Sequence, residues 1–543
     1  MSQFVCFFAL FQRLILGLLG FGLAFSGSAA FAESLRIATS YKLMTLDPHF
    51  ANLNENTSLL SQIYERLVYQ DERLALQPGL AVSWRSVSAD VWEFKLRPGV
   101  RFHDGSALEA DDVVYSIERV RDFLDPPGGG YRSYVTGIAT VSAVDALTVR
   151  VETKGPVPNL PLGLSSIFIM NRPQTGFQTT EALNGGGAGA GEAGGAGGIA
   201  PNGTGPYRFD SWTSGETLSL TANDDYWGTR PTWPGVVFRV IESPAARVAA
   251  LSTGDVDIAD TIPARDVASL KGRGVQIASI GAARINFLQF DIARDTLPDV
   301  TAISGAPIAN PFKHLAVRQA LAMATDRSIL VDKILAGYGM AAAQVFPNGL
   351  PGTSPKLSPA AVDYAGAKAL LASAGYPNGF KLLLAGPAGR YPGDGESLQA
   401  VAQNWARIGV VVQPQAAPFS VFNTRRAAGD YAVWYGGTSG EAVDIVLDAL
   451  LASPDKARGT GALNFGGYRN AQFDALLSQA ESIEAGPQRD AALADATEFV
   501  LADQPIIPLY HFHHVTGFGP RVGHYTMHPR GWTTAMQAQP AEE

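Results

Sequence analysis

The chain has 543 residues, of which 46% are hydrophobic and 17% are charged, and its formal net charge at pH 7 is −9. A chain of this length exceeds what one compact hydrophobic core supports, so we expect two or three lobes. Nucleic acid is not an expected partner, because the net charge is negative and no run of lysine or arginine stands out.

Residues 1–32 have the features of a secretory signal peptide. Arg13 supplies a positive charge, an apolar run extends from Leu14 to Phe25, and Ala30-Phe31-Ala32 forms an A-x-A cleavage site. We therefore predict cleavage after Ala32 and a periplasmic protein; an uncleaved signal would leave a membrane anchor instead. The single cysteine, Cys6, would be removed, which excludes disulfides, thiolate catalysis and cysteine metal sites from the mature chain.

The mature chain is predicted to begin with a β-strand at Ser34–Ser40, followed by a loop that contains Tyr41. A helix is predicted over Thr57–Val68, where the apolar residues recur on one face.

The most informative stretch follows. Apolar and charged residues alternate from Val91 to Leu96, which predicts a half-buried strand. Turn residues at Pro98-Gly99 and Asp104-Gly105 bracket a second short strand, so this segment is predicted to form a hairpin. Asp111 or Asp112 is expected to cap the next helix, whose apolar stripe consists of Val113, Val114, Ile117 and Val120.

The residues from Trp92 to Ser116 follow the pattern W-x-F-x-L-R-x-G-V-x-F-H-D-G, then an acidic pair and V-V-Y-S. In this they resemble the signature of the bacterial family 5 solute-binding proteins, the peptide, oligopeptide and nickel receptors of ABC importers. In that family the segment is structural, so Trp92, His103 and Asp104 are expected to hold the hairpin and its turn together.

Other passages resemble the same family. They include T-L-D-P, which ends at Pro48, G-T-G-P-Y at Gly203–Tyr207, and V-R-Q-A-L, which begins at Val317. The resemblance covers nearly the whole mature chain. It implies that the loop after the first strand borders the ligand cleft, which makes Tyr41 a site candidate; a core or rim tyrosine is the alternative.

Between these passages, alternation over Thr140–Glu152 predicts a pair of strands. Residues 185–198 contain only glycine, alanine and one glutamate, which is typical of a flexible surface insertion. This segment holds a formal G-x-G-x-x-G at Gly189–Gly194, but a dinucleotide site would need a strand before it and a helix after it.

The pattern of Val236–Ile258 is strand, helix and strand, which predicts parallel strands in an α/β lobe. A strand at Arg284–Asp291 resembles the family's passage from the first lobe to the second. The elements predicted beyond it are helices at Val317–Ala336, Asp363–Gly375, Leu398–Arg407 and Phe473–Val500 and strands at Lys381–Ala385, Val410–Val412 and Pro505–Phe512.

The resemblance implies a two-lobed α/β periplasmic binding protein fold of type II, similar to cluster C, with a hinge between the lobes. We expect lobe I at 33–284 and lobe II at 285–504, with residues 505–543 returning to lobe I. An extra α+β subdomain of lobe I is expected at about 55–200.

The segment Arg425–Glu441 is the leading candidate for ligand contact. By resemblance, Trp434, Tyr435, Gly436, Gly437 and Thr438 belong to the family's ligand-binding segment, and the two glycines let backbone approach a ligand closely. Arg425 is a candidate partner for a ligand carboxylate, unless it is a solvated surface charge.

The family's peptide binders typically show W-x-x-D in this segment, and the aspartate accepts the α-ammonium group of the peptide. Here Tyr435 and Thr438 stand in those places, and a threonine hydroxyl carries no charge to balance an ammonium. Glu441 is the candidate substitute, although a glutamate at a helix N-terminus is also favoured by the helix dipole.

No sequence motif supports catalysis. G-x-S-x-G and H-E-x-x-H are absent from the mature sequence, and no cofactor is implied. His511, His513 and His514 could bind a metal if a further ligand approached, which keeps a metal-binding protein or hydrolase as an alternative.

We therefore expect a non-enzymatic, monomeric receptor that delivers peptides or peptide-like solutes to the permease of an ABC importer; an opine, a glycoside or a metal chelate is the alternative cargo.

Overall fold

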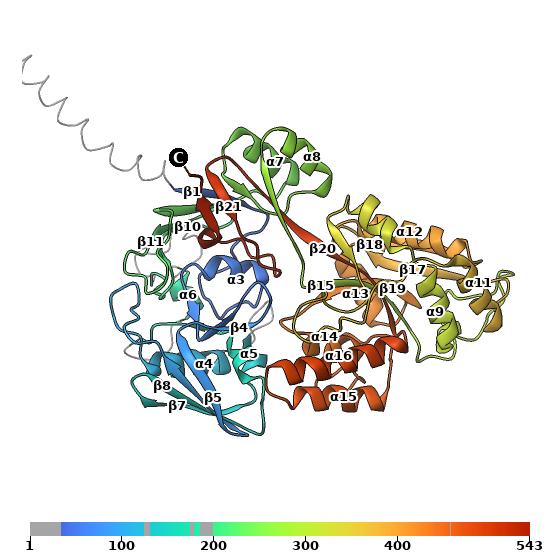
Figure 1. Ribbon diagram of the computed structural model, residues 1–543, viewed down its shortest axis with the longest axis horizontal. Coiled ribbons are helices and arrows are strands. Elements are labelled where there is room, and N and C mark those ends of the chain that lie inside the picture. Colours follow the sequence, from blue (N-terminus) through green and yellow to red (C-terminus); the bar gives the residue numbers. More distant parts are fainter. Residues whose placement is uncertain (1–33, 124–130, 174–178, 185–198, 457, 543) are drawn as a thin grey trace, which may run out of the picture.

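The computed structural model describes residues 34–123, 131–173, 179–184, 199–456 and 458–542. These residues form two α/β lobes side by side, connected by strands that pass between them (Figure 1). The two-lobed fold expected from the sequence is confirmed. The predicted signal peptide and the glycine-rich segment lie outside the described residues.

Lobe I is built on a parallel core of three strands. β1 (Leu35–Thr39) lies between β12 (Gly235–Val240) and β13 (Ile258–Ala259) and is parallel to both. Helix α7 (Pro244–Thr253) connects β12 to β13, so the predicted strand–helix–strand unit is confirmed. β10 (Tyr207–Thr213) and β11 (Thr217–Ala222) extend this sheet in antiparallel fashion.

A four-stranded antiparallel sheet in the order β5-β6-β8-β7 lies beside lobe I, and we call it the subdomain sheet. Its strands are β5 (Ala81–Ser88), β6 (Val91–Leu96), β7 (Ile138–Asp145) and β8 (Thr148–Thr153). The predicted hairpin is wrong in its pairing, because β6 pairs with β5 and β8. Residues 100–102 make only an isolated bridge, between Arg101 and Ala107.

Helix α4 (Ala110–Asp122) covers the subdomain sheet; Val113, Ile117 and Val120 of the predicted apolar stripe are buried, and Val114 is partly buried. Its cap differs from the prediction. Glu109 is the N-cap residue and Asp112 is the third helical residue, and each side chain accepts a hydrogen bond from the backbone of the other.

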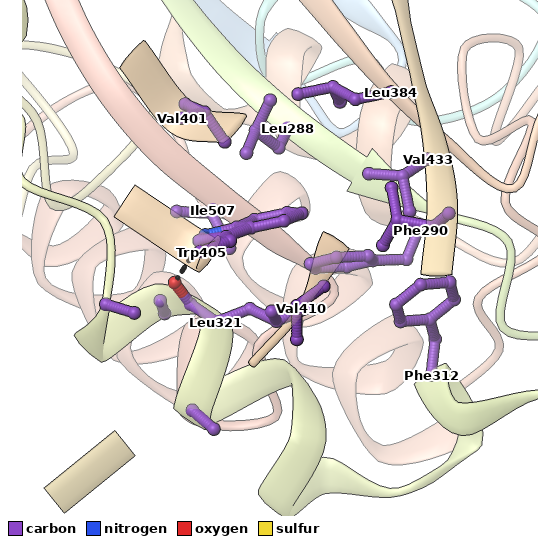
Figure 2. Close-up of a cluster of buried hydrophobic side chains, with 14 of the residues drawn as sticks. Leu288, Phe290, Phe312, Leu321, Leu384, Val401, Trp405, Val410, Val433 and Ile507 are labelled. Carbon is purple, nitrogen blue, oxygen red and sulfur yellow. Dashed lines mark hydrogen bonds between the residues drawn. The ribbon is translucent and has the colours of Figure 1, made fainter. Parts of the chain in front are cut away.

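Lobe II contains three parallel strands, in which β17 (Lys381–Pro387) lies between β18 (Val411–Ala417) and β19 (Val433–Ser439). β15 (Arg284–Phe290) is antiparallel to β19. The lobe core surrounds Trp405 of α12 (Asp394–Ala406), which packs among the labelled side chains of Figure 2. The indole Nε1 of Trp405 donates a hydrogen bond to the carbonyl of Leu321, 3.1 Å away.

The helix predicted over Val317–Ala336 is divided. α9 (Leu315–Met323) ends before Asp326, and the Asp326 carboxylate caps α10 (Arg327–Ile329) by accepting two backbone hydrogen bonds. A π-helical turn at Leu330–Ile334 follows. Asp326 therefore starts a new helix where the sequence pattern suggested continuity.

Two strands pass between the lobes. β14 (Gln276–Gly281) leads into β15, and β20 (Ile506–Phe518) runs antiparallel to both. β20 pairs with β15 as far as Tyr510 and with β14 from His513 onward. The passage back to lobe I therefore lies between Tyr510 and His513, whereas the sequence places it near Gln504.

The other strands are β2 (Glu65–Arg66), β3 (Val68–Gln70), β4 (Leu76–Pro78), β9 (Phe168–Ile169), β16 (Gly339–Ala341), β21 (Val522–Tyr525) and β22 (Ala538–Pro540). The other α-helices are α3 (Asn54–Leu60), α5 (Leu160–Leu164), α6 (Thr180–Leu183), α8 (Val267–Gly272), α11 (Tyr364–Ser373), α13 (Phe419–Ala427), α14 (Val443–Leu451), α15 (Ala471–Glu481) and α16 (Pro487–Ala502).

The G-T-G-P-Y segment explains why α3 is shorter than the helix predicted over Thr57–Val68. The backbone N–H groups of Gly205 and Tyr207 donate to the carbonyls of Ile63 and Gln62, at 2.9 and 3.0 Å. Those carbonyls are therefore engaged by the G-T-G-P-Y segment. A Cβ atom on Gly203 would overlap the carbonyl oxygen of Ile63, so only glycine fits there.

We predict that Gly203→Ala lowers the free energy of unfolding by about 1–3 kcal/mol or more, because the added methyl group forces two backbone segments apart. Urea unfolding at neutral pH measures the effect. Gly155→Ala is the matched control, since a Cβ there would meet nothing within 4 Å. Its stability should change by less than about 1 kcal/mol. Equal stabilities for the two variants would contradict this packing account.

A second prediction concerns His49, which is 1% exposed. Burial lowers the pKa of His49 to about 4, whereas an unfolded histidine has a pKa of about 6.5. Between these values the unfolded chain binds a proton that the folded chain does not, so the folded state loses stability as the pH falls from about 6.5 to about 4. His49→Gln removes this loss. The free energy of unfolding of His49→Gln minus that of wild type should therefore be roughly 2–3 kcal/mol larger at pH 4.5 than at pH 7.5.

The comparison at pH 7.5, above both pKa values of His49, measures the packing loss alone. Subtracting wild type at each pH cancels the opposite contributions of Glu65 and Asp260, because burial raises the pKa of Glu65 to about 7 and that of Asp260 to about 6. A stability difference that stays constant with pH would refute the role assigned to His49.

Candidate ligand-binding cleft between the lobes

The parallel strands of both lobes place their carboxyl ends at the passage between the lobes. Ligands of open α/β sheets bind outside such ends. A cavity of about 210 Å³ lies there. Asp260 and the four residues that follow it, directly after β13, line it from lobe I, and Leu335, Tyr338 and Pro392 line it from lobe II. We call the space between these walls the cleft.

The three neighbouring histidines lie on β20 at the passage between the lobes. His511 is 2% exposed, and its Nδ1 donates to the carbonyl oxygen of Arg284 at 2.9 Å, which links the two crossing strands. His513 and His514 line the cavity. Within the described ranges, no three histidine, cysteine or carboxylate side chains lie close enough together to hold a metal ion.

The lobe I wall carries a buried carboxylate, Asp260. Its Oδ1 accepts a hydrogen bond from the backbone of Ser40 at 2.9 Å and lies 3.7 Å from Nε of Arg247. Its Oδ2 has no hydrogen-bond partner in the described part of the chain. Burial raises the pKa of Asp260 to about 6. This oxygen can accept a hydrogen bond from a ligand donor.

Two arginines of lobe II lie beside Tyr391, close to the cavity-lining Pro392. The Cζ atoms of Arg284 and Arg390 each lie 5.9 Å from the centre of the Tyr391 ring. Among the described residues, no carboxylate lies within 4 Å of either guanidinium. Arg284 is half-buried, and burial lowers its pKa. A half-buried cation without a counter-ion favours the binding of an anionic group.

Glu441 connects the two lobes by an ion pair. Its Oε1 lies 2.9 Å from the guanidinium of Arg530 in lobe I and accepts a hydrogen bond from the hydroxyl of Tyr134 at 3.1 Å. The backbone carbonyl of Glu441 accepts a hydrogen bond from Gln70 at 2.8 Å. The side chains of Glu441 and Arg530 are only 12% and 18% exposed, so Glu441 already has a cationic partner in this conformation.

The aromatic candidates of β19 lie inside lobe II. Tyr435 is fully buried, and its hydroxyl is 2.7 Å from that of Tyr510. Trp434 is 2% exposed and packs against Phe422 and Tyr431. In this conformation neither ring reaches the cleft.

The glycines of β19 allow close packing within lobe II rather than toward a ligand. A Cβ on Gly436 would meet the ring of Phe287, and one on Gly437 would lie 2.9 Å from the ring of Tyr391. The hydroxyl of Tyr391 donates to the carbonyl of Gly437 at 2.9 Å. Thr438 is half-buried and pairs with Ile285, next to Arg284.

The two remaining candidates differ in position. Tyr41 is half-buried beside the core of lobe I, and its hydroxyl is 3.3 Å from Ser58 Oγ. Arg425 is 43% exposed near the end of α13 and pairs with Asp430 at 3.1 Å. It therefore lies on the surface of lobe II, and its charge is already balanced.

Sequence reasoning did not select Arg284, Arg390, Tyr391 or Asp260. A usable signal existed for three of them, because Asp260 directly follows a predicted parallel strand and Arg390 and Tyr391 closely follow another. Arg284 opens a predicted strand, and its lack of a counter-ion is visible only in the fold.

Comparison with known proteins agrees with this architecture. The family model for bacterial extracellular solute-binding proteins, family 5 middle, matches residues 75–451. The chain is 27% identical over 522 residues to the glutathione-binding protein GsiB of Escherichia coli (strain K12), covering 92% of this chain and 94% of that protein. It is 26% identical over 505 residues to heme-binding protein A of Haemophilus influenzae, covering 87% and 85%.

Solved structures share the fold. HbpA2 from Haemophilus parasuis superimposes with a TM-score of 0.78 at 25% identity, covering 94% of this chain and 100% of that chain. The murein tripeptide binding protein MppA, in its unliganded open form, gives a TM-score of 0.76 at 23% identity, covering 94% and 98%. The chain thus belongs to the bacterial extracellular solute-binding proteins of family 5.

Proposed function

We propose that this protein captures a small peptide or peptide-like solute with at least one carboxylate in the cleft, and delivers it to the permease of an ABC importer. The observation that carries the proposal is Arg284, a half-buried guanidinium without a counter-ion at the point where the lobes meet. A ligand carboxylate there would gain charge-assisted hydrogen bonds that solvent cannot match. Glutathione, which the relative from Escherichia coli binds, is a solute of this class.

The same walls offer acceptors for the donor groups of a peptide-like solute. Oδ2 of Asp260 is one, and Glu441 is the other if a ligand displaces its partner Arg530. Glu441 thus remains our candidate for an ammonium group, in place of the aspartate that Thr438 replaces. A ligand that touches both walls stabilises the closed arrangement of the lobes, which is the form expected to engage the permease.

The proposed location is the periplasm, after cleavage behind Ala32. Within the described ranges, none of the helices combines the length and the apolar character of a membrane span. We propose a monomer that acts without a cofactor.

Native mass spectrometry of the mature protein from a periplasmic extract tests the cargo. We expect one or more small peptide-like acids to be released on denaturation. A bound heme, sugar or metal chelate without a peptide-like part would show that this chain carries another cargo. If no solute is bound, titration with glutathione and tri-alanine followed by thermal unfolding decides the matter.

We predict that Arg284→Gln weakens binding of the captured solute by about 10- to 100-fold, because one charge-assisted hydrogen bond contributes roughly 1.5–3 kcal/mol. Isothermal titration calorimetry measures the dissociation constant. Arg425→Gln is the matched control, since Arg425 is exposed and already paired with Asp430. We expect it to bind like wild type. A larger loss in Arg425→Gln than in Arg284→Gln would move the carboxylate site to the arginine that the sequence alone suggests.

A further inference from the structure

Arg66 is a buried cation of lobe I that lies beside Trp532, whose neighbours Gly531 and Thr533 line the cavity. It lies in β2 and is 7% exposed. Its guanidinium is packed between two aromatic rings, with Cζ 4.0 Å from the centre of the Phe168 ring and 5.2 Å from that of Trp532. Its Nε is buried without a hydrogen-bond partner in the described part of the chain.

Arg66 is an exception among the buried arginines of the described residues. The other four each have a carboxylate within 4 Å, namely Asp47 for Arg119, Asp260 for Arg247, Asp503 for Arg318 and Asp444 for Arg489. No described carboxylate lies that close to Arg66. A buried charge without a partner is costly, so it is retained only where a partner arrives or a function requires it.

The charged group that acts on Arg66 is itself a cation. The pKa of Arg66 is lowered to about 10, mainly by burial and also by the charge of Arg530, whereas Tyr131 and Tyr134 act in the opposite direction. Arg530 lies on the same aromatic ring, with its Cζ 5.0 Å from the centre of Trp532. An anion between the two guanidiniums would relieve both the desolvation of Arg66 and the repulsion from Arg530.

Arg530 already pairs with one carboxylate. Glu441 of lobe II reaches across to Arg530 and Tyr134, as described above. The site therefore has two cations and one carboxylate, and that carboxylate pairs with Arg530. The chemistry of this site suits a carboxylate that enters from the cleft.

We propose that Arg66, together with Arg530 and Tyr134, forms an anion subsite on lobe I that binds a carboxylate of the captured solute. The proposal rests on the function proposed above and narrows it. Arg284 and Arg390 lie beside Tyr391 in lobe II, so the preferred solute is a peptide-like acid with at least two carboxylates, one for each lobe.

The first test is the sign of a stability change without ligand. Arg66→Met keeps an unbranched apolar side chain as far as the position of Nε and removes the unpaired charge, so the urea midpoint should rise. Arg119→Met is the matched control, because Arg119 is 3% exposed and paired with Asp47 at 2.6 Å. Its midpoint should fall. If the urea midpoint of Arg66→Met falls as that of Arg119→Met does, Arg66 is a structural residue and the proposal is wrong.

The second test uses succinate as the probe, with the full mature chain. The melting temperature of wild type should be higher in succinate than in sodium chloride of equal ionic strength, and succinamide should have no effect. The shift should be absent in Arg66→Met and reduced in Arg66→Lys, which keeps the charge but not the planar fork of donors. A missing shift in wild type, or an equal shift in Arg66→Met, would overturn the subsite.

These outcomes are separate from those of the receptor function. If native mass spectrometry finds no solute and the peptide titrations fail while succinate still binds at Arg66, the proposed cargo is wrong but the subsite exists. If a peptide-like acid binds equally well to wild type and Arg66→Met, the receptor function holds and the subsite does not.

Discussion

The architecture depends on the backbone pairing of β20 with strands of both lobes. This strand pairs with β15 in lobe II and with β14 and β13 in lobe I, so one continuous sheet passes through the junction. Breaking this pairing would leave buried backbone donors and acceptors in need of new partners. The lobes can therefore change their relative angle only by bending this sheet.

The pairing between β15 and β20 is irregular at one place. The pairing register of β15 with β20 shifts between Asn286 and Phe287, opposite Pro508 and Tyr510. Proline lacks an N–H donor, and such irregularities bend a strand locally. The hydrogen bond between His511 and the carbonyl of Arg284 lies directly beyond this point. Arg284 is thus attached to β20 next to this irregularity, so a ligand that binds Arg284 would contact the chain close to it.

The fold was largely predictable because its signals are local. The parallel unit around α7 and most of the helices and strands follow from periodicity and turn residues, and Asp363 caps α11 as its sequence suggests. The pairing of β6 was not predictable, because alternation shows that a strand is half-buried but does not show which strand lies beside it. The capping of α4 by Glu109 was missed for a similar reason, since three neighbouring acids can all serve as caps.

The site was less predictable, for a physical reason that Tyr435 and Arg66 illustrate. An aromatic residue in a buried strand has the same sequence pattern whether it faces a core or a cleft, and Tyr435 faces the core. Arg66 resembles any polar residue of a short strand. Its isolation becomes visible only when Phe168 and Trp532 enclose it and every other buried arginine in the described ranges is seen to have a carboxylate.

In the proposed function, the ion pair between Glu441 and Arg530 would make binding selective. Both side chains are largely buried, so separating them without replacement leaves two unpaired charges in a poorly solvated place. A solute without charged groups cannot compensate either charge. A solute with an ammonium and a carboxylate would replace both partners at once, and Arg66 would add attraction for the carboxylate alone. If the pair contributes roughly 1.5–3 kcal/mol, a ligand that replaces only one partner would bind about 10- to 100-fold more weakly than a zwitterion that replaces both.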